Sequence, residues 1–164
     1  MTPATSDHEP GTLLRGAGLR VTGPRVAVLK VLAVCPHSTA DAIATQVRDV
    51  LGSVSTQAVY DVLRALVGAG LVRRIEPAGS PALYETRTGD NHHHLVCRVC
   101  GAVVDVDCVT GEAPCLDPSD LAGFAVDEAE VVFWGTCAEC RASGNTTGSR
   151  WNAAQPQRGD EIER

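Results

Sequence analysis

The chain has 164 residues, of which 44% are apolar and 21% are charged, so it is long enough for one or two small domains. It has no run of about 18 apolar residues, and its first residues, MTPATSDHEPG, lack a charged-then-apolar signal pattern. We therefore expect a cytoplasmic protein that neither spans a membrane nor is secreted. Seven cysteines, four of them in two C-x-x-C pairs, indicate metal binding in a reducing compartment rather than a disulfide framework.

The formal net charge of -6 is unevenly distributed along the chain. Residues 1–90 carry 9 basic and 8 acidic side chains, whereas residues 91–164 carry 5 basic and 12 acidic ones. The overall acidity therefore does not exclude nucleic-acid binding by the first half. Arginine outnumbers lysine 13 to 1, which suits phosphate recognition but is equally explained by a GC-rich genome.

The first predicted helix lies near the N-terminus. Residues 1–10 have no apolar periodicity and are predicted to be disordered. Thr22 is the expected helix cap, Pro24 lies in the first turn, and the run RVAVLKVLAV ends before Pro36. Because this run is apolar nearly all round, we expect the helix to lie at the centre of its domain.

Two further helices and a hairpin are predicted next. The second helix begins at a variant capping box formed by Ser38 and Asp41 and ends at Gly52. Its apolar positions follow helical spacing at Ala40, Ile43, Ala44, Val47, Val50 and Leu51. The third helix begins at Ser55 and is broken by Gly68 and Gly70. Its apolar stripe consists of Val59, Val62, Leu63, Leu66 and Val67.

The strand-like runs LVRRI and ALYET follow, joined by the turn EPAGSP. Three helices followed by a hairpin predict a winged helix-turn-helix over residues 11–87.

The third helix carries a second, polar stripe that is compatible with DNA reading. Gln57, Tyr60, Asp61 and Arg64 recur at i, i+3, i+4 and i+7. Glutamine suits an adenine edge, tyrosine a thymine methyl group, and arginine a guanine or a phosphate. The alternative is an ordinary solvated helix face, and the charge of Asp61 opposes DNA binding. Phosphate contacts are expected from Ser55 and Thr56 at the helix start and from Arg73 and Arg74 in the wing.

The pattern changes near residue 88 from helix-like to valine-rich and strand-like. We place a hinge at residues 88–91 and a second domain at residues 92–142, with strand-like runs AVVDVD and EVVFWGT. From Ser143 onward the chain is rich in Gly, Asn, Thr and Gln and is predicted to be disordered. Trp151 in this tail has no assigned role.

Four cysteines of the second half have zinc-ligand spacing. Cys97 and Cys100 form one C-x-x-C pair, and Cys137 and Cys140 form the other. Two such pairs supply the four thiolates of a tetrahedral structural zinc site. The alternatives are a redox motif or plain buried cysteines, but neither explains why the C-x-x-C motif occurs twice. Zinc binding of this kind stabilises a small domain by on the order of 10 kcal/mol.

A second candidate ligand set has nitrogen and oxygen donors. The segment HHHLV reads as a strand, so His92 and His94 are expected on one face and His93 on the other. Further candidates are His37, Glu85 and Asp105. Imidazoles combined with carboxylates suit Fe(II) or Mn(II) better than four thiolates do. A solvated loop histidine remains the alternative for His37.

These motifs, in this order, resemble the ferric uptake regulator (Fur) superfamily of metal-dependent bacterial repressors. The resemblance extends from about Gly11 to Arg141 and is carried by GLRVTGPR, HSTADAI, VSTQAVYDVLRALVGAGLVRR, YET, HHHLVCRVCG and WGTCAEC. Within the superfamily, DNHHHLVCRVCG followed by VDVDCVTGEAPCL is most similar to the actinobacterial FurA/CatR group, whose members repress catalase-peroxidase genes and respond to peroxide.

The resemblance implies an α+β homodimer with an N-terminal winged-helix DNA-binding domain and a C-terminal α/β dimerisation domain. It implies a structural zinc ion at the four cysteines and a regulatory Fe(II) or Mn(II) ion that links the two domains. The ligands implied for the regulatory ion are His37, Glu85, His92, His94 and Asp105. The bound ion is expected to lock an arrangement that matches a palindromic operator, with Tyr60 in the DNA-reading helix.

Departures from the family pattern bear on the signal and the operator. Glu85 stands where the best-known peroxide sensors carry Asp, and Asp61 replaces the Arg usual after Tyr60 in iron-sensing members. Asn91 and Ala129 stand where a third family metal site often has histidines, so that site is not expected. The alternative within the family is an iron or zinc uptake regulator.

The alternative from another class is a thiol oxidoreductase or a metal-dependent enzyme. No nucleophile–base pair or cofactor loop is visible, so we expect no enzyme activity. Three further cysteines remain. Cys35 is expected in the core, while Cys108 and Cys115 flank VTGEAP and are a possible redox pair.

Overall fold

The computed structural model describes residues 9–77, 79–90, 92–107, 122–123, 125 and 131–144. The chain divides into two compact units. The first comprises Met1–Glu76 and Pro81–Asp90, and the second comprises Pro77–Ser80 and Asn91–Arg164. Among the described residues, no helix has the length and apolar character needed to cross a membrane.

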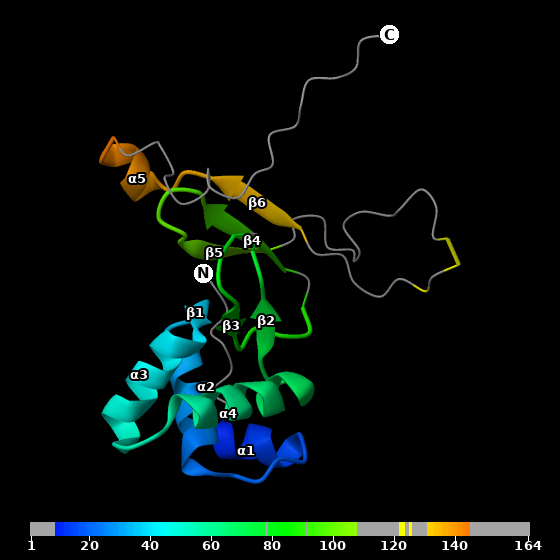
Figure 1. The fold of residues 1–164 in the computed structure, drawn as a ribbon. Helices are drawn as coiled ribbons and strands as arrows, with labels where there is room; N and C mark the ends of the chain where they lie inside the picture. Colours follow the sequence, from blue (N-terminus) through cyan, green and yellow to red (C-terminus); the bar gives the residue numbers. More distant parts are fainter. Residues whose placement is uncertain are drawn as a thin grey trace. The chain divides into compact units, whose positions relative to one another are not determined.

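The first unit combines a helical bundle with a small sheet (Figure 1). Its elements are α1 (Pro10–Gly16), α2 (Gly23–Val34), β1 (Ser38–Thr39), α3 (Ala40–Leu51), α4 (Thr56–Gly68), β2 (Arg73–Ile75) and β3 (Leu83–Glu85). The three strands are antiparallel and follow the order β1-β3-β2. The predicted three helices and hairpin are confirmed, whereas α1 and β1 were not expected.

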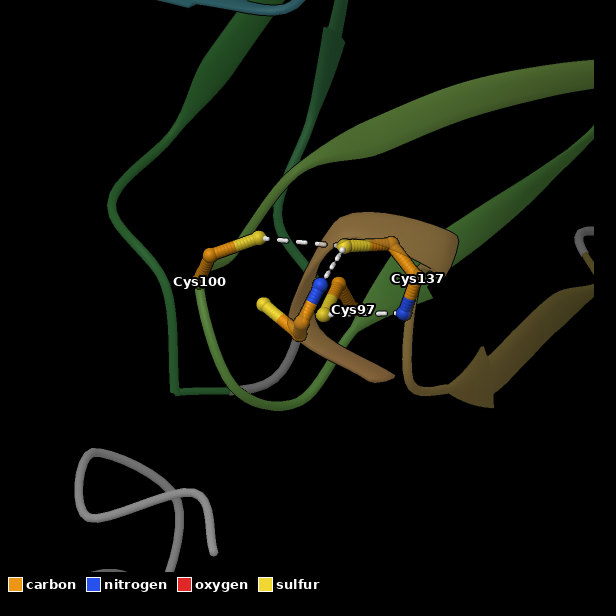
Figure 2. Close-up of side chains that lie close together, drawn as sticks. Cys97, Cys100 and Cys137 are labelled. Atoms are coloured by element: carbon orange, nitrogen blue, oxygen red, sulfur yellow. Dashed lines mark hydrogen bonds between the residues drawn. The ribbon is translucent and has the colours of Figure 1, made fainter. Parts of the chain in front are cut away.

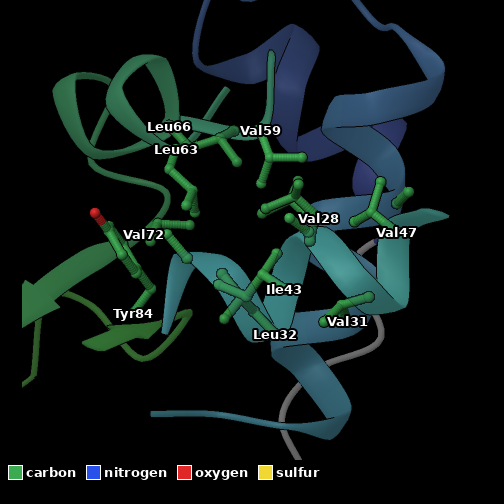
Figure 3. Close-up of a cluster of buried hydrophobic side chains, with 14 of the residues drawn as sticks. Val28, Val31, Leu32, Ile43, Val47, Val59, Leu63, Leu66, Val72 and Tyr84 are labelled. Carbon is green, nitrogen blue, oxygen red and sulfur yellow. The ribbon is translucent and has the colours of Figure 1, made fainter. Parts of the chain in front are cut away.

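The core of this unit lies where α2, α3 and α4 meet the sheet (Figure 3). Leu32, Ile43 and Leu63 come from the three helices and are almost completely buried. Burying each such side chain contributes about 1.5–3 kcal/mol. Helix α2 packs against α1, α3, α4 and β3, which confirms its predicted central position.

The helix boundaries correct several expectations. Thr22 is the N-cap of α2 but makes no capping hydrogen bond through its side chain. The cap of α3 is Thr39, whose Oγ1 accepts a hydrogen bond of 3.2 Å from the Ala42 N–H. The predicted cap Ser38 is wrong, because α3 begins at Ala40 and the Ser38 hydroxyl donates to the Cys35 carbonyl instead. Helix α4 ends at Gly68, as its glycines predicted.

The apolar stripe of α3 is shorter than predicted. Ile43 and Val47 are completely buried, but Val50 is 70% exposed and Leu51 is 41% exposed. Helical spacing identifies which positions share a face. It does not tell where along the helix the neighbouring elements stop covering that face.

Among the residues that the structure describes, the second unit contains a three-stranded sheet and a short helix (Figure 1). Its elements are β4 (His92–Cys97), β5 (Val103–Asp107), β6 (Val132–Gly135) and α5 (Ala138–Ala142). The order is β5-β4-β6, with β4 antiparallel to β5 and parallel to β6. The expected strands are confirmed, with β5 and β6 shorter than predicted and β4 one residue longer, and α5 was not expected.

The structure describes ordered residues within both terminal segments that were predicted to be disordered. Pro10 already belongs to α1. The Ser143 hydroxyl donates a 3.0 Å hydrogen bond to the Cys140 carbonyl, so order extends past the predicted start of the tail. Residues 1–8 and 145–164, including Trp151, lie outside the described residues.

Candidate functional site

The four cysteines of the two C-x-x-C motifs come together in the second unit. Their sulfur atoms all lie within 4.8 Å of one another. Figure 2 shows the sulfurs of Cys97, Cys100 and Cys137 gathered around one point. The Cys100 and Cys137 sulfurs are 3.8 Å apart, which is too far for a disulfide bond. A tetrahedron with metal–sulfur bonds of about 2.3 Å has edges of about 3.8 Å, so this spacing fits a zinc ion.

Local backbone structure places each cysteine pair. Cys97 ends β4, and the turn after it closes through a hydrogen bond of 2.9 Å from the Gly101 N–H to the Cys97 carbonyl. Gly101 has a φ of +77°, a conformation that glycine adopts without steric cost. Cys137 caps α5 by accepting a 3.4 Å hydrogen bond from the Cys140 N–H on its sulfur. Each pair is therefore held by a turn or a cap encoded next to it.

Hydrogen bonds and burial alter the acidity of three of these thiols, among them Cys97 and Cys140. Burial by itself raises the pKa of Cys97, but hydrogen bonds from the backbone of Cys100, Cys137 and Val99 outweigh it and lower the pKa to about 6. The side-chain hydrogen bond with Cys137, together with burial, raises the pKa of Cys140 to about 12. The Cys97 sulfur is thus favoured as a thiolate, which is the form that binds metal.

An additional contact that the sequence did not reveal adjoins the cysteine cluster. The Arg98 guanidinium lies 5.2 Å from the centre of the Trp134 ring, within the range of a cation–π interaction. The backbone N–H of Arg98 also donates a 2.8 Å hydrogen bond to the Gly135 carbonyl. These contacts join the first cysteine turn to β6, the strand that leads to the second pair.

In the first unit, the structure brings together two of the candidate nitrogen and oxygen ligands. The His37 Nε2 lies 3.0 Å from the Glu85 Oε2, although the residues are 48 positions apart. The Glu85 side chain is completely buried and the His37 side chain is 8% exposed. The pairing of β1 with β3, with Ser38 opposite Tyr84, places the two residues next to each other. A solvated loop position for His37 is thereby excluded.

The second unit brings together the other three candidates. On β4, His92 and His94 have their rings 4.9 Å apart. The Asp105 Oδ1 on β5 lies 3.9 Å from the His92 Nε2 and 3.6 Å from the His94 Nε2. His93 instead lies beside Phe133, with ring centres 6.0 Å apart. The predicted alternation of the three histidines is confirmed.

The predicted DNA-reading stripe lies on the exposed side of α4. Tyr60 is 40% exposed, and Gln57 and Arg64 are also exposed. Ser55 caps the helix by accepting a 3.1 Å hydrogen bond from the Ala58 N–H. Thr56 accepts a 3.4 Å hydrogen bond from Arg48 of α3, a basic neighbour that the sequence did not single out.

The two wing arginines lie on β2 and differ in exposure. Arg74 is exposed and forms an ion pair with Glu76, while Arg73 is half-buried and lies opposite Glu85 in the sheet register. The acidic partner reduces the positive charge that Arg74 offers to a phosphate.

Several remaining sequence hypotheses are corrected or lie outside the described residues. Cys35 is half-buried and does not belong to the hydrophobic core cluster, so its predicted core position is wrong. Cys108 and Cys115, the possible redox pair, lie outside the described residues, as do Asn91 and Ala129.

Comparisons with known proteins show that this chain is similar to transcriptional regulators. Residues 16–132 match the model of the ferric uptake regulator family. The transcriptional regulator FurA of Mycobacterium tuberculosis is 60% identical over 130 residues, which cover 79% of this chain and 88% of that protein. The peroxide-responsive repressor PerR of Staphylococcus epidermidis is 30% identical over 138 residues, covering 80% of this chain and 88% of that one.

A solved structure shares the fold. The ferric uptake regulator from Pseudomonas aeruginosa with manganese superposes with a TM-score of 0.63 at 29% identity, covering 79% of this chain and 98% of that one. The expected α+β class, with a winged-helix unit followed by a second α/β unit, is confirmed by this likeness.

Proposed function

Because this chain belongs to the ferric uptake regulator family of metal-dependent transcriptional regulators, we propose that it represses catalase-peroxidase and other oxidative-stress genes and that it senses peroxide through a bound Fe(II) ion. The identity to mycobacterial FurA and the likeness to PerR support this assignment. Cytoplasmic location follows from this role, since the operator is chromosomal DNA.

The observation that carries the proposal is the chemical difference between two donor sets. Four sulfur donors form one set, which we assign to a closed structural zinc site. The candidate ligands of the other set are three imidazoles and two carboxylates, and these donors suit Fe(II) or Mn(II). We assign the regulatory ion to His37, Glu85, His92, His94 and Asp105. Burial of Glu85 and His94 supports this assignment, because buried charged and polar groups gain most from a cation.

Metal binding controls DNA binding in this proposal. A ligand shifts a conformational equilibrium only as far as it binds one state better than the other. The ligands come from both units of the chain, so an ion that needs all of them favours one arrangement of those units. That arrangement is the one that presents α4 to a palindromic operator.

We also propose a homodimer, supported by the sheet of the second unit. Leu95 lies opposite Val104 on one side and Phe133 on the other. These three neighbouring side chains are 45%, 58% and 46% exposed, respectively. An apolar face of this kind favours association with a second copy.

A second candidate signal is iron itself, and Glu85 favours it. A ferrous ion held by these residues would supply one electron to hydrogen peroxide. Glutamate is one methylene longer than aspartate, and both oxygens of its carboxylate can occupy coordination positions. If both oxygens of Glu85 occupy coordination positions of the ion, peroxide is excluded from it. The protein then responds to iron supply instead of peroxide.

One experiment tests the regulator and separates the two signals. DNA binding is measured with Fe(II)-loaded and Mn(II)-loaded protein before and after peroxide, followed by mass spectrometry. Peroxide sensing predicts loss of DNA binding with Fe(II) only, and one added oxygen on the peptides that contain His37 or His92 to His94. Iron sensing predicts no such change, and Glu85→Asp is then expected to make the protein peroxide-sensitive.

A thiol-based response gives a different result. Loss of two hydrogens across Cys108 and Cys115 in the Mn(II) form, together with DNA release, contradicts metal-based sensing. Protein that shows no metal-dependent DNA binding at all contradicts the repressor function.

A further inference from the structure

An acidic residue holds two potential base-reading side chains on α4. The Asp61 Oδ1 accepts a hydrogen bond of 3.1 Å from the Gln57 Nε2 and another of 3.1 Å from the Arg64 NH1. The side chain of Asp61 is 55% exposed and that of Arg64 is 76% exposed. The three residues are spaced four and three positions apart, so they form one row along the helix.

Stability does not account for this arrangement. Exposed ion pairs contribute little to folding because water already solvates both charges. A carboxylate on a helix that approaches DNA also repels the phosphates. An acidic residue at this place therefore weakens non-specific binding, and it needs a compensating effect on specific binding.

We infer that Asp61 is a specificity-determining positioning residue, which holds Arg64 and Gln57 in the orientations that read base edges. This inference rests on the proposed function of α4 in DNA recognition. A fixed side chain loses less conformational entropy on binding and is restricted to partners that match its geometry.

The hydrogen bonds determine which edge each side chain presents. With NH1 of Arg64 directed at Asp61, the Nε and NH2 donors form the remaining edge of the guanidinium fork. That edge matches the O6 and N7 acceptors of guanine. A carboxylate only accepts hydrogen bonds, so the Gln57 amide must turn its nitrogen toward Asp61. Its oxygen and second N–H are then oriented for the adenine pair of donor and acceptor.

The experiment uses full-length, zinc-containing protein loaded with Mn(II) and a randomised duplex DNA library. The wild type and Asp61→Ala are each used to select binding sites. Affinities are then measured for the wild-type site and for its single-base variants. We expect Asp61→Ala to lose about tenfold in discrimination at the guanine and adenine positions, the size of one good base contact. Its affinity for unrelated DNA is expected to rise, because a negative charge has been removed.

Two controls separate positioning from charge and from direct reading. Asp49→Ala removes the same charge from an exposed position of α3 and is expected to leave the selected sequence unchanged. In a Gln57→Ala/Arg64→Ala background, adding Asp61→Ala is expected to change base preference no further, as a double-mutant cycle requires when one residue acts through the others. The thermal midpoint of Asp61→Ala reports that its fold is intact.

The outcomes are distinguishable. An unchanged site and unchanged discrimination in Asp61→Ala overturn the inference while leaving the proposed function in place. An effect of Asp61→Ala that persists without Gln57 and Arg64 also overturns it, because Asp61 then reads a base directly. A wild type that selects no sequence overturns the proposed function, and the inference with it.

Discussion

At the residue scale, His37 has an unusual backbone conformation. Its φ is +56°, one of two positive values among the described non-glycine residues. Histidine tolerates this left-handed region better than β-branched residues do. The turn directs the imidazole to the buried Glu85 carboxylate. The same conformation therefore connects α2 to β1 and orients a candidate ligand.

Substitutions at His37 separate these two roles. His37→Asn and His37→Val both remove the imidazole, but only valine is strained at this φ. We expect His37→Val to be less stable than His37→Asn by about 1–2 kcal/mol, measured by urea unfolding of protein without regulatory metal. Both variants are expected to bind Mn(II) more weakly than the wild type. Equal stability of the two variants would show that the backbone conformation relaxes.

At the element scale, the pairing of strands decides whether the two C-x-x-C motifs form one site. Strand β4 ends at Cys97, which lies opposite Gly135 of the parallel strand β6. Cys137 follows two residues later and caps α5. Parallel strands that end side by side bring these two turns together across 36 intervening residues.

Loss of one thiolate is expected to unfold this unit. Cys97→Ser removes a ligand with a lowered pKa, and the small sheet then lacks the stabilisation that zinc provides. We expect about one zinc less per chain and loss of strand signal in circular dichroism. Cys35→Ser is the matched control, since this half-buried thiol belongs to the first unit, and zinc content is expected to stay unchanged. A folded, zinc-free Cys97→Ser protein would refute the structural role of the metal.

At the scale of the whole molecule, the uneven charge fits a division of tasks. The near-neutral first half carries the helix that we assign to DNA, while the acidic second half carries His92, His94 and the four thiolates. An acidic surface is repelled by phosphates, so we expect contacts between protein and operator to be confined to the first unit.

The proposed dimer can be tested with two matched valine substitutions. Val104 is 58% exposed on the apolar sheet face, and Val34 is 81% exposed at the end of α2. Val104→Lys places two charges in the interface of a symmetric dimer and is expected to shift sedimentation toward monomer. Val34→Lys introduces the same charge elsewhere and is expected to remain dimeric. Equal behaviour of the two variants would place the interface on another surface.

The sequence by itself determined the features that depend on neighbouring residues. Ser55 was recognisable as a cap because capping acts over three residues, and the alternation along HHHLV correctly separated His93 from His92 and His94. The two C-x-x-C motifs indicated metal because each pair is already a bidentate ligand. These signals are local, so they do not depend on how distant segments pack.

Tertiary structure decided the rest, because long-range pairing selects among local alternatives of similar energy. Ser38 and Thr39 are both good caps and both pair with β3, but α3 begins at Ala40, so Thr39 is the cap, while the Ser38 hydroxyl donates to the Cys35 carbonyl. The same pairing brings His37 to Glu85, which no spacing rule predicts across 48 residues. The role of Asp61 as a hydrogen-bond acceptor likewise depends on the rotamers of Gln57 and Arg64. The sequence indicated only that the charge of Asp61 is unfavourable near DNA.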